Sequence, residues 1–316
     1  MSPLRLGYLY GLGAYLLWGF FPLYFKLLRP AGALEILAHR VVWSLAFVAL
    51  LLAALRNVGF LRALVRRPRA LLGISAAAAL IAVNWAAYIY GVNSGRVVET
   101  ALGYFINPLV SVLLGVGVLR ERLRPAQWLA LGVGGAAVAV LTVDYGRLPW
   151  LALTLAATFA AYGLVKKRLA LPAAEGLFVE SAVLALPALG YLGWLAAADD
   201  ATFGHVSAGH TVLLVLAGAV TAIPLLLFAG AANRLPLTAL GMLQYLTPVL
   251  QFACGVLIFH EPMPPARLAG FALVWAALLV FTTDALADAL AHTRRTRRTP
   301  TRTGRDLAVA APGTRH

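Results

Sequence analysis

Apolar stretches long enough to cross a lipid bilayer recur along nearly the whole chain. A hydrocarbon core about 30 Å thick needs about 20 apolar residues at a rise of about 1.5 Å each. Lipid offers no partner for backbone polar groups, so such segments must be helical. The predicted fold class is therefore an all-α integral membrane protein with about ten transmembrane helices, at residues 7–28, 35–55, 70–93, 97–119, 126–144, 149–165, 175–196, 210–231, 236–259 and 266–285.

The composition agrees with a lipid environment. Of the 316 residues, 61% are apolar and 12% charged, against about 45–50% and about 25% in soluble domains. The net charge of +14 would suit a nucleic-acid partner, but most of the basic residues lie in short gaps between apolar runs, where topology signals belong. We therefore expect a lipid bilayer and no nucleic acid as partner. The single cysteine, Cys254, and the lack of metal-ligand spacing predict no cofactor and no metal.

The basic residues of the loops predict an orientation. Ten crossings place both termini on one side, and the loops and termini of that side hold twenty Lys and Arg residues against five on the other. An excess of positive charge marks the cytoplasmic side, so both termini are expected in the cytoplasm. The twenty are Arg5, Arg56, Arg62, Arg66, Arg67, Arg69, Arg120, Arg122, Arg124, Lys166, Lys167, Arg168, Arg234 and seven arginines of the C-terminal tail.

The chain also contains an internal repeat. A shift of 140 residues places Pro108 on Pro248, and it does the same for four further pairs, namely Gly115 and Gly255, Glu121 and Glu261, Pro125 and Pro265, and Asp144 and Asp284. Each half holds five helices, an odd number, so the second half must be inverted in the membrane. We expect a first repeat at 1–145, a second at 146–287 and a disordered basic cytoplasmic tail at 288–316. Inverted repeats are typical of secondary transporters.

Several motifs resemble a known family. They are Trp18-Gly19-Phe20-Phe21-Pro22-Leu23-Tyr24-Phe25-Lys26, Glu35-Ile36-Leu37-Ala38-His39-Arg40, Leu102-Gly103-Tyr104-Phe105-Ile106-Asn107-Pro108-Leu109 and Leu240-Gly241-Met242-Leu243-Gln244-Tyr245-Leu246-Thr247-Pro248. Together they resemble RarD-type transporters, in the EamA branch of the drug/metabolite transporter superfamily. The resemblance spans about residues 7 to 285. It implies a permease of the bacterial inner membrane that exports small metabolites or related compounds through a central cavity.

Uncharged polar and aromatic residues cluster near the expected midplane. They provide hydrogen bonds without the solvation cost of a charge, and their rings suit organic solutes. We expect them to line a substrate cavity between the halves, although such residues also hold membrane helices together. The predicted cavity residues are Asn84, Tyr88, Tyr104, Asn107, Gln244 and Tyr245.

Ionisable residues and prolines inside the spans are candidates for gating or coupling. Arg40 lies about 8–10 Å from the outer surface, and Glu35 and His39 share its region of the helix. The alternatives for Arg40 are a substrate or proton site, or an ion pair with Glu35 or Glu99. Glu180 occupies the repeat-equivalent position and would carry a proton if desolvation raised its pKa, unless Lys166 or Lys167 kept it ionised. Matching hinges are expected at Pro108 and Pro248.

Two other functions are alternatives to export. An integral membrane enzyme acting on lipid-linked substrates needs clustered catalytic or metal-binding groups, and the adjacent acids Asp199 and Asp200 lie in an outer loop instead. An uptake permease of the same fold remains an alternative. Proton coupling and facilitated passage are both compatible with this sequence.

The charge distribution yields a topological test. A reporter fused after Arg298 is expected to be active in the cytoplasm, and one fused after Ala201, in a predicted outer loop, outside it. The second fusion serves as the control for reporter function. An external location after Arg298 would reverse the orientation of every helix.

Overall fold

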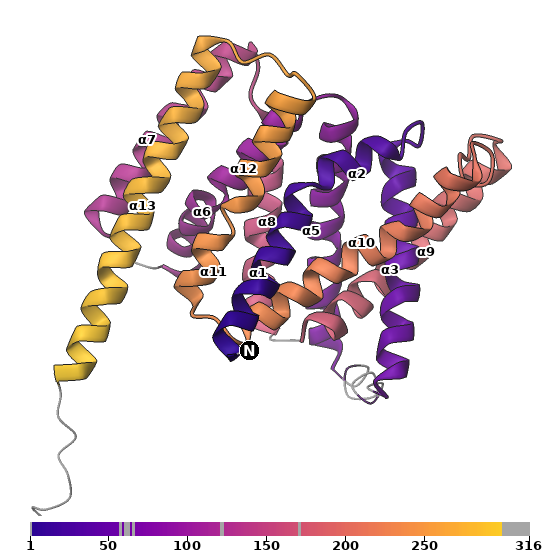
Figure 1. The fold of residues 1–316 in the computed structure, drawn as a ribbon, viewed down its shortest axis with the longest axis horizontal. Coiled ribbons are helices and arrows are strands. Elements are labelled where there is room, and N and C mark those ends of the chain that lie inside the picture. Colours follow the sequence, from indigo (N-terminus) through magenta and orange to yellow (C-terminus); the bar gives the residue numbers. More distant parts are fainter. Residues whose placement is uncertain are drawn as a thin grey trace, which may run out of the picture.

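The computed structural model describes residues 2–56, 59, 64, 67–120, 123–169 and 172–298, and within these ranges it contains helices and no strands (Figure 1). Eight described helices are long and apolar enough to span a membrane, and a bent pair supplies a ninth span. A shorter apolar helix, Trp150–Lys166, corresponds to the remaining expected span. The predicted all-helical membrane fold is confirmed.

The helices follow the expected segments closely. In chain order they are α1 Pro3–Gly19, α2 Phe21–Leu27, α3 Ala33–Ala54, α5 Pro68–Asn93, α6 Val97–Leu119, α7 Pro125–Tyr145, α8 Trp150–Leu169, α9 Ala173–Ala197, α10 Ala208–Ala232, α11 Leu237–Leu243, α12 Leu246–Ala253, the π-helix Cys254–Ile258 and α13 Pro265–Arg298. The first expected span is thus α1 with α2, and the ninth is α11, α12 and the π-helix.

The internal repeat is visible in the helix boundaries. The helices α3, α5, α6 and α7 begin at 33, 68, 97 and 125, and α9, α10, α11 and α13 begin 140 residues later. The helix contacts follow the same relation. The pair α5 and α8 packs together, and so does the equivalent pair, α10 and α1. In addition, α3 packs on its own equivalent, α9, and α7 packs on its equivalent, α13. These correspondences support the predicted two-fold repeat.

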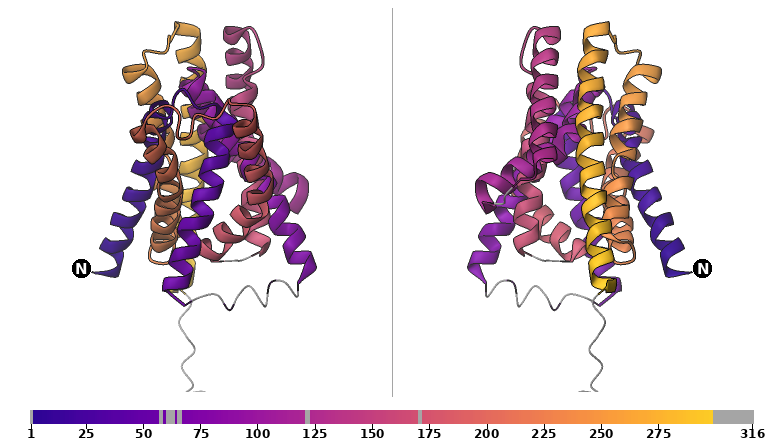
Figure 2. Two further views of the ribbon diagram at one scale, coloured as in Figure 1. Left: turned by 90° about the vertical axis from the view of Figure 1, so that its right-hand side faces the viewer. Right: turned by 90° about the vertical axis from the view of Figure 1, so that its left-hand side faces the viewer.

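Two ion pairs show that α7 and α13 run antiparallel (Figure 2). Near the C-terminal end of α7, Asp144 accepts a hydrogen bond from Arg267 of α13 at 2.8 Å. Its repeat equivalent, Asp284 of α13, lies 2.8 Å from Arg124, which precedes α7. The equivalent acids Asp144 and Asp284 therefore hold opposite ends of the α7–α13 pair together, as expected if the two repeats are inverted.

The C-terminal helix is longer than expected. Disorder was predicted from residue 288, yet α13 continues to Arg298. The segment Ala285-Leu286-Ala287-Asp288-Ala289-Leu290 is rich in helix formers, and extending an existing helix needs no new nucleus. Residues 299–316 lie outside the described residues, as do Arg62, Arg66, Glu121 and Arg122.

Prolines interrupt the helices unequally. The axes of α1 and α2 differ by 43°, with a break at Phe20 shortly before Pro22. A second break separates α11 from α12 at Gln244, four residues before Pro248, which has no N–H to donate to the Gln244 carbonyl. Pro108 instead lies inside the continuous helix α6. The two expected hinge positions therefore differ in backbone structure.

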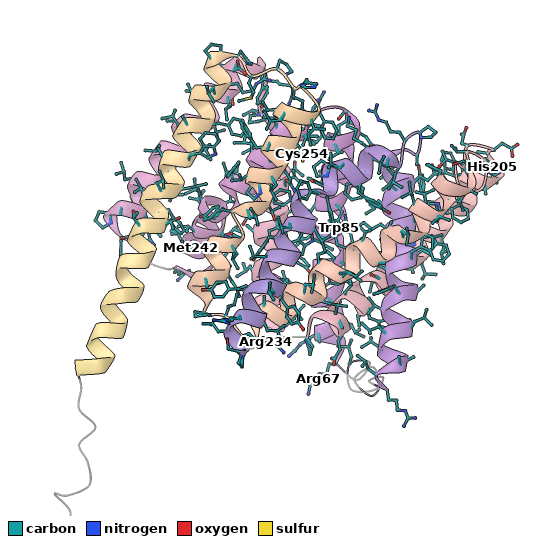
Figure 3. All side chains as sticks on the ribbon, viewed as in Figure 1. Arg67, Trp85, His205, Arg234, Met242 and Cys254 are labelled. Carbon is teal, nitrogen blue, oxygen red and sulfur yellow. The ribbon has the colours of Figure 1, made fainter. Side chains whose placement is uncertain are left out.

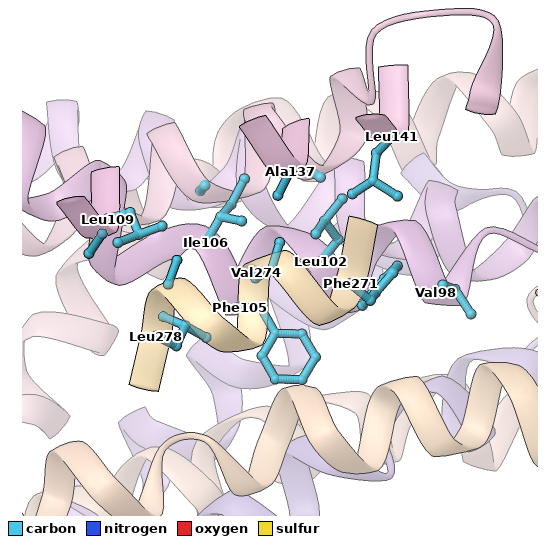
Figure 4. Packing of buried hydrophobic residues seen from close by; sticks show 14 residues of the cluster. Val98, Leu102, Phe105, Ile106, Leu109, Ala137, Leu141, Phe271, Val274 and Leu278 are labelled. Carbon is cyan, nitrogen blue, oxygen red and sulfur yellow. The ribbon is translucent and has the colours of Figure 1, made fainter. Parts of the chain in front are cut away.

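The largest hydrophobic cluster joins four helices of both halves (Figure 4). Leu102 and Phe105 of α6 and Leu141 of α7 meet Phe271 and Val274 of α13 there. Their side chains are at most 2% exposed. This cluster holds the antiparallel α7–α13 pair against α6.

The helices α3 and α10 approach each other with their backbones almost in contact. A Cβ atom on Gly218 would lie 2.3 Å from both the carbonyl carbon and the oxygen of Trp43. Small residues permit such approaches between membrane helices. The approach brings the next turn of α10, with Thr221, against α3.

The Gly218 contact predicts a position-specific loss of stability. Gly218→Ala should destabilise the protein by about 1–3 kcal/mol, because backbone atoms cannot yield as a flexible side chain does. Thermal unfolding of the purified protein in detergent would measure it. Gly190→Ala on α9, where a Cβ meets nothing within 4 Å, is the control and should unfold at the wild-type temperature or slightly higher. Equal effects of both changes would contradict the tight α3–α10 packing.

Candidate functional site

Arg40 lies in the interior of the bundle and links the two halves. Its side chain projects from α3, is only 3% exposed, and donates from Nε to the Thr221 hydroxyl of α10 at 2.7 Å. The guanidinium carbon lies 3.9 Å from the centre of the Trp85 ring. Trp85 occupies the middle of the molecule in Figure 3.

The alternative ion pairs of Arg40 do not form. Glu35 accepts hydrogen bonds from the backbone N–H and the hydroxyl of Thr202 at 2.8 and 2.9 Å. Glu99 binds Arg147 at 2.6 Å. Among the described residues no carboxylate lies within ion-pair distance of Arg40. The structural ion-pair hypothesis for Arg40 is therefore wrong for both named partners.

Three predicted cavity residues come together beside Arg40. The hydroxyl of Tyr104 donates to Oδ1 of Asn84 at 3.3 Å, and the rings of Tyr88 and Tyr104 meet edge to face at 5.7 Å. Asn84 donates in turn to the Leu155 carbonyl of α8 at 2.9 Å. The amide of Asn84 thus holds α5 to α8, while the buried hydroxyl of Tyr88 has no hydrogen-bond partner among the described residues.

The remaining predicted cavity residues lie elsewhere. Asn107 is half-buried and donates to the Ala156 carbonyl at 3.3 Å. Tyr245 contacts Thr282 of α13 at 3.4 Å between hydroxyl oxygens, and Gln244 is exposed at the break after α11. Met242, two residues before Gln244, lies well apart from Trp85 in Figure 3. The structure does not bring Gln244 and Tyr245 to the Arg40 region.

Glu180 and His39 have different surroundings. Glu180 is 3% exposed, lies 2.7 Å from Nζ of Lys166 and accepts a hydrogen bond from Tyr162 at 3.1 Å. The ring of His39 stacks on Phe203 at 4.7 Å and accepts at Nδ1 from Trp43. Its Nε2 atom is buried without a hydrogen-bond partner among the described residues. Lys166 is thus the partner of Glu180, one of the two lysines expected from the sequence, and His39 belongs to the surface of α3 that faces the 199–206 loop.

Two pockets lie at the end of the bundle that carries the α2–α3 turn. A pocket of about 450 Å³ is lined by residues such as Arg29, Tyr90 and Asn93. A pocket of about 260 Å³ is lined by residues such as His39 and Phe203. The predicted cavity residues line neither of the two.

Buried carboxylates fasten the loops at this same end. Glu261 accepts hydrogen bonds from the backbone N–H groups of Val97 and Val98, at 2.6 and 2.9 Å, and so caps α6. Burial raises the pKa of the Glu261 carboxyl, and these two hydrogen bonds partly offset the effect. With Glu35 on Thr202 and Glu99 on Arg147, three acids connect loops to helices at the end opposite the N-terminus.

Two buried polar residues make contacts between helices that were not predicted from the sequence. Thr221 gave no signal, because a lone threonine in an apolar helix is common. Gln251, two turns after Gln244, is 2% exposed and donates to the Trp18 carbonyl at 3.1 Å. That carbonyl would bond to residue 22 in a regular helix, where proline lacks the N–H. Gln251 therefore replaces the hydrogen bond that Pro22 cannot make, and the proline itself was the available signal.

Comparison with known proteins agrees with this architecture. Residues 5–143 match the EamA-like transporter family. The chain is 58% identical over 285 residues to protein RarD of Streptomyces exfoliatus, covering 90% of both chains. It is 44% identical over 284 residues to an uncharacterized transporter of Pseudomonas aeruginosa, covering 90% of this chain and 95% of the relative.

A solved structure shares the fold alone. It aligns with a TM-score of 0.55 and 22% identity, covering 88% of this chain and 98% of the other. The helical architecture, the relatives and the family match lead to one assignment. The chain is a multi-pass membrane protein that belongs to the RarD-type transporters of the EamA family.

Proposed function

We propose that this transporter exports small organic metabolites or related compounds across the bacterial inner membrane by alternating access. In this mechanism the two inverted halves exchange conformations, which opens a site between them to one side at a time. Transport of this kind needs no cofactor. The match to a transporter family and the transporter name of the Pseudomonas aeruginosa relative support a protein that is not an enzyme.

The observation that carries the proposal is the hydrogen bond between Arg40 and Thr221. Intramembrane charges are costly and typically mark a substrate or ion pathway. Arg40 comes from the first half and Thr221 from the second, so this charge lies where the halves meet. Rocking of the halves would change the contacts of the guanidinium group.

The export direction and the orientation rest on other observations. The twenty-to-five distribution of basic residues supports cytoplasmic termini. Export is the activity that the family resemblance implies, with uptake as the alternative. For proton coupling, His39 is the better candidate than Glu180, because its buried Nε2 atom has no hydrogen-bond partner among the described residues, whereas Glu180 is paired with Lys166 at 2.7 Å.

Metabolite profiling of the growth medium tests this function. Compounds that depend on the transporter should accumulate in medium from cells with the wild-type protein and decline, by at least about tenfold, with Arg40→Gln, which removes a charge in the pathway. Arg234→Gln is the matched control, because Arg234 follows α10, is exposed, and its side chain donates to the Gly230 carbonyl of that helix.

Membrane abundance, measured on the same cells, separates transport from folding. The proposal requires near-normal amounts of the Arg40→Gln protein. Faster disappearance of a compound from the medium in wild-type cells would indicate uptake instead. If the composition of the medium is the same with and without the protein across many growth conditions, the transport proposal is contradicted.

A further inference from the structure

Arg40 differs from three buried acids of the bundle, each of which is paired with a cation. Glu99 is paired with Arg147, Asp144 with Arg267, and Glu180 with Lys166, at 2.6–2.8 Å. Arg40 is as deeply buried as these acids, yet no described carboxylate balances its charge. Since a guanidinium group stays protonated in proteins, the site keeps a positive charge that the described residues do not neutralise.

Aromatic rings replace the missing acid only in part. The guanidinium carbon lies 3.9 Å from the centre of the Trp85 ring, and 5.6 and 5.7 Å from those of Phe21 and Phe25. Ring faces attract a cation, but they do not neutralise it. The short Trp85 distance also fixes the position of the group, so that less freedom is lost when an anion binds.

The hydrogen-bonding groups at this point are donors. Among the described residues, Arg40 donates only from Nε, to Thr221, which leaves its terminal nitrogens available. Two parallel N–H groups of a guanidinium match the two oxygens of a carboxylate. The buried Tyr88 hydroxyl also lacks a partner among the described residues. Phe25 contacts both the Tyr88 ring, at 5.9 Å, and the Arg40 guanidinium, so both donors lie around one phenylalanine.

We propose that the substrates are small organic carboxylates with an apolar or aromatic body, bound through the carboxylate to Arg40 and Tyr88. This inference rests on the transport function proposed above. The carboxylate would supply the charge that the protein lacks. The apolar body would lie on the rings that surround the charge, which are those of Trp85, Phe21 and Phe25. A cationic compound of the same shape would be repelled, and a neutral one would leave the guanidinium unpaired.

Three probes with the same ring and different charge test the proposal. Benzoate, benzamide and benzylamine would each be titrated into purified protein in lipid nanodiscs at constant ionic strength. Binding would be read from the unfolding temperature, which a ligand of the folded state raises, and from tryptophan fluorescence. We expect benzoate to bind at least about tenfold more tightly than either analogue, the preference expected of a charge-assisted hydrogen bond.

Single substitutions would show which residues cause the preference for benzoate. Arg40→Gln should abolish the benzoate preference, and Arg40→Lys should weaken it because an ammonium group lacks the planar fork. Tyr88→Phe should weaken benzoate binding several-fold and leave the affinity for benzamide unchanged. This variant tests the proposal even if the Arg40 variants do not fold. Arg234→Gln should bind benzoate as the wild type does. Equal binding of the three probes, or a benzoate preference that survives Arg40→Gln, would overturn the carboxylate assignment.

The medium profiles distinguish the two proposals. Transporter-dependent compounds that are neutral or cationic would leave the transport function intact and refute the carboxylate class. Selective benzoate binding without any transporter-dependent compound would support the site and contradict export.

Discussion

The close approach of α3 and α10 is the contact on which the site depends. Gly218 lets the two backbones meet at Trp43, and Thr221, one turn further along α10, then reaches Nε of Arg40. A larger residue at 218 would separate the helices and remove this hydrogen bond. The same small residue therefore governs helix packing and the position of the charge, because lipid supplies no hydrophobic force to press the helices together.

Much of the fold was predictable because the bilayer imposes few solutions. The thickness of the hydrocarbon core fixes span lengths, so hydropathy located every segment, and the 140-residue repeat anticipated where α9, α10, α11 and α13 begin. The bend at Phe20 and the break at Gln244 follow from the missing N–H groups of Pro22 and Pro248. The continuity of α6 through Pro108 could not be predicted from the sequence, because the packing of neighbouring helices decides whether a helix that contains proline stays continuous.

The candidate site was predictable only in part. Counting residues gives depth in the membrane but not direction around the helix. Tyr88 and Tyr104 meet as expected, whereas Gln244 and Tyr245 lie at a helix break, where a regular helix gives the wrong angle. The partner of Arg40 was not predicted because both proposed partners, Glu35 and Glu99, are acids, while the structure supplies the hydroxyl of Thr221, 181 residues away.

The repeat itself explains why Arg40 lacks an acid. Glu180 is the equivalent of Arg40 in the second half and pairs with Lys166, whose own equivalent in the first half is Lys26. The lysine is thus present in both halves, but the first half has an arginine where the second has the acid. An ion pair at the first position is therefore impossible, since both members would be cations. Lys26 instead lies 5.2 Å from the centre of the Phe259 ring, and Arg40 turns to Thr221 and Trp85. The asymmetry leaves one half with a neutralised charge and the other with a cation that a bound anion would balance.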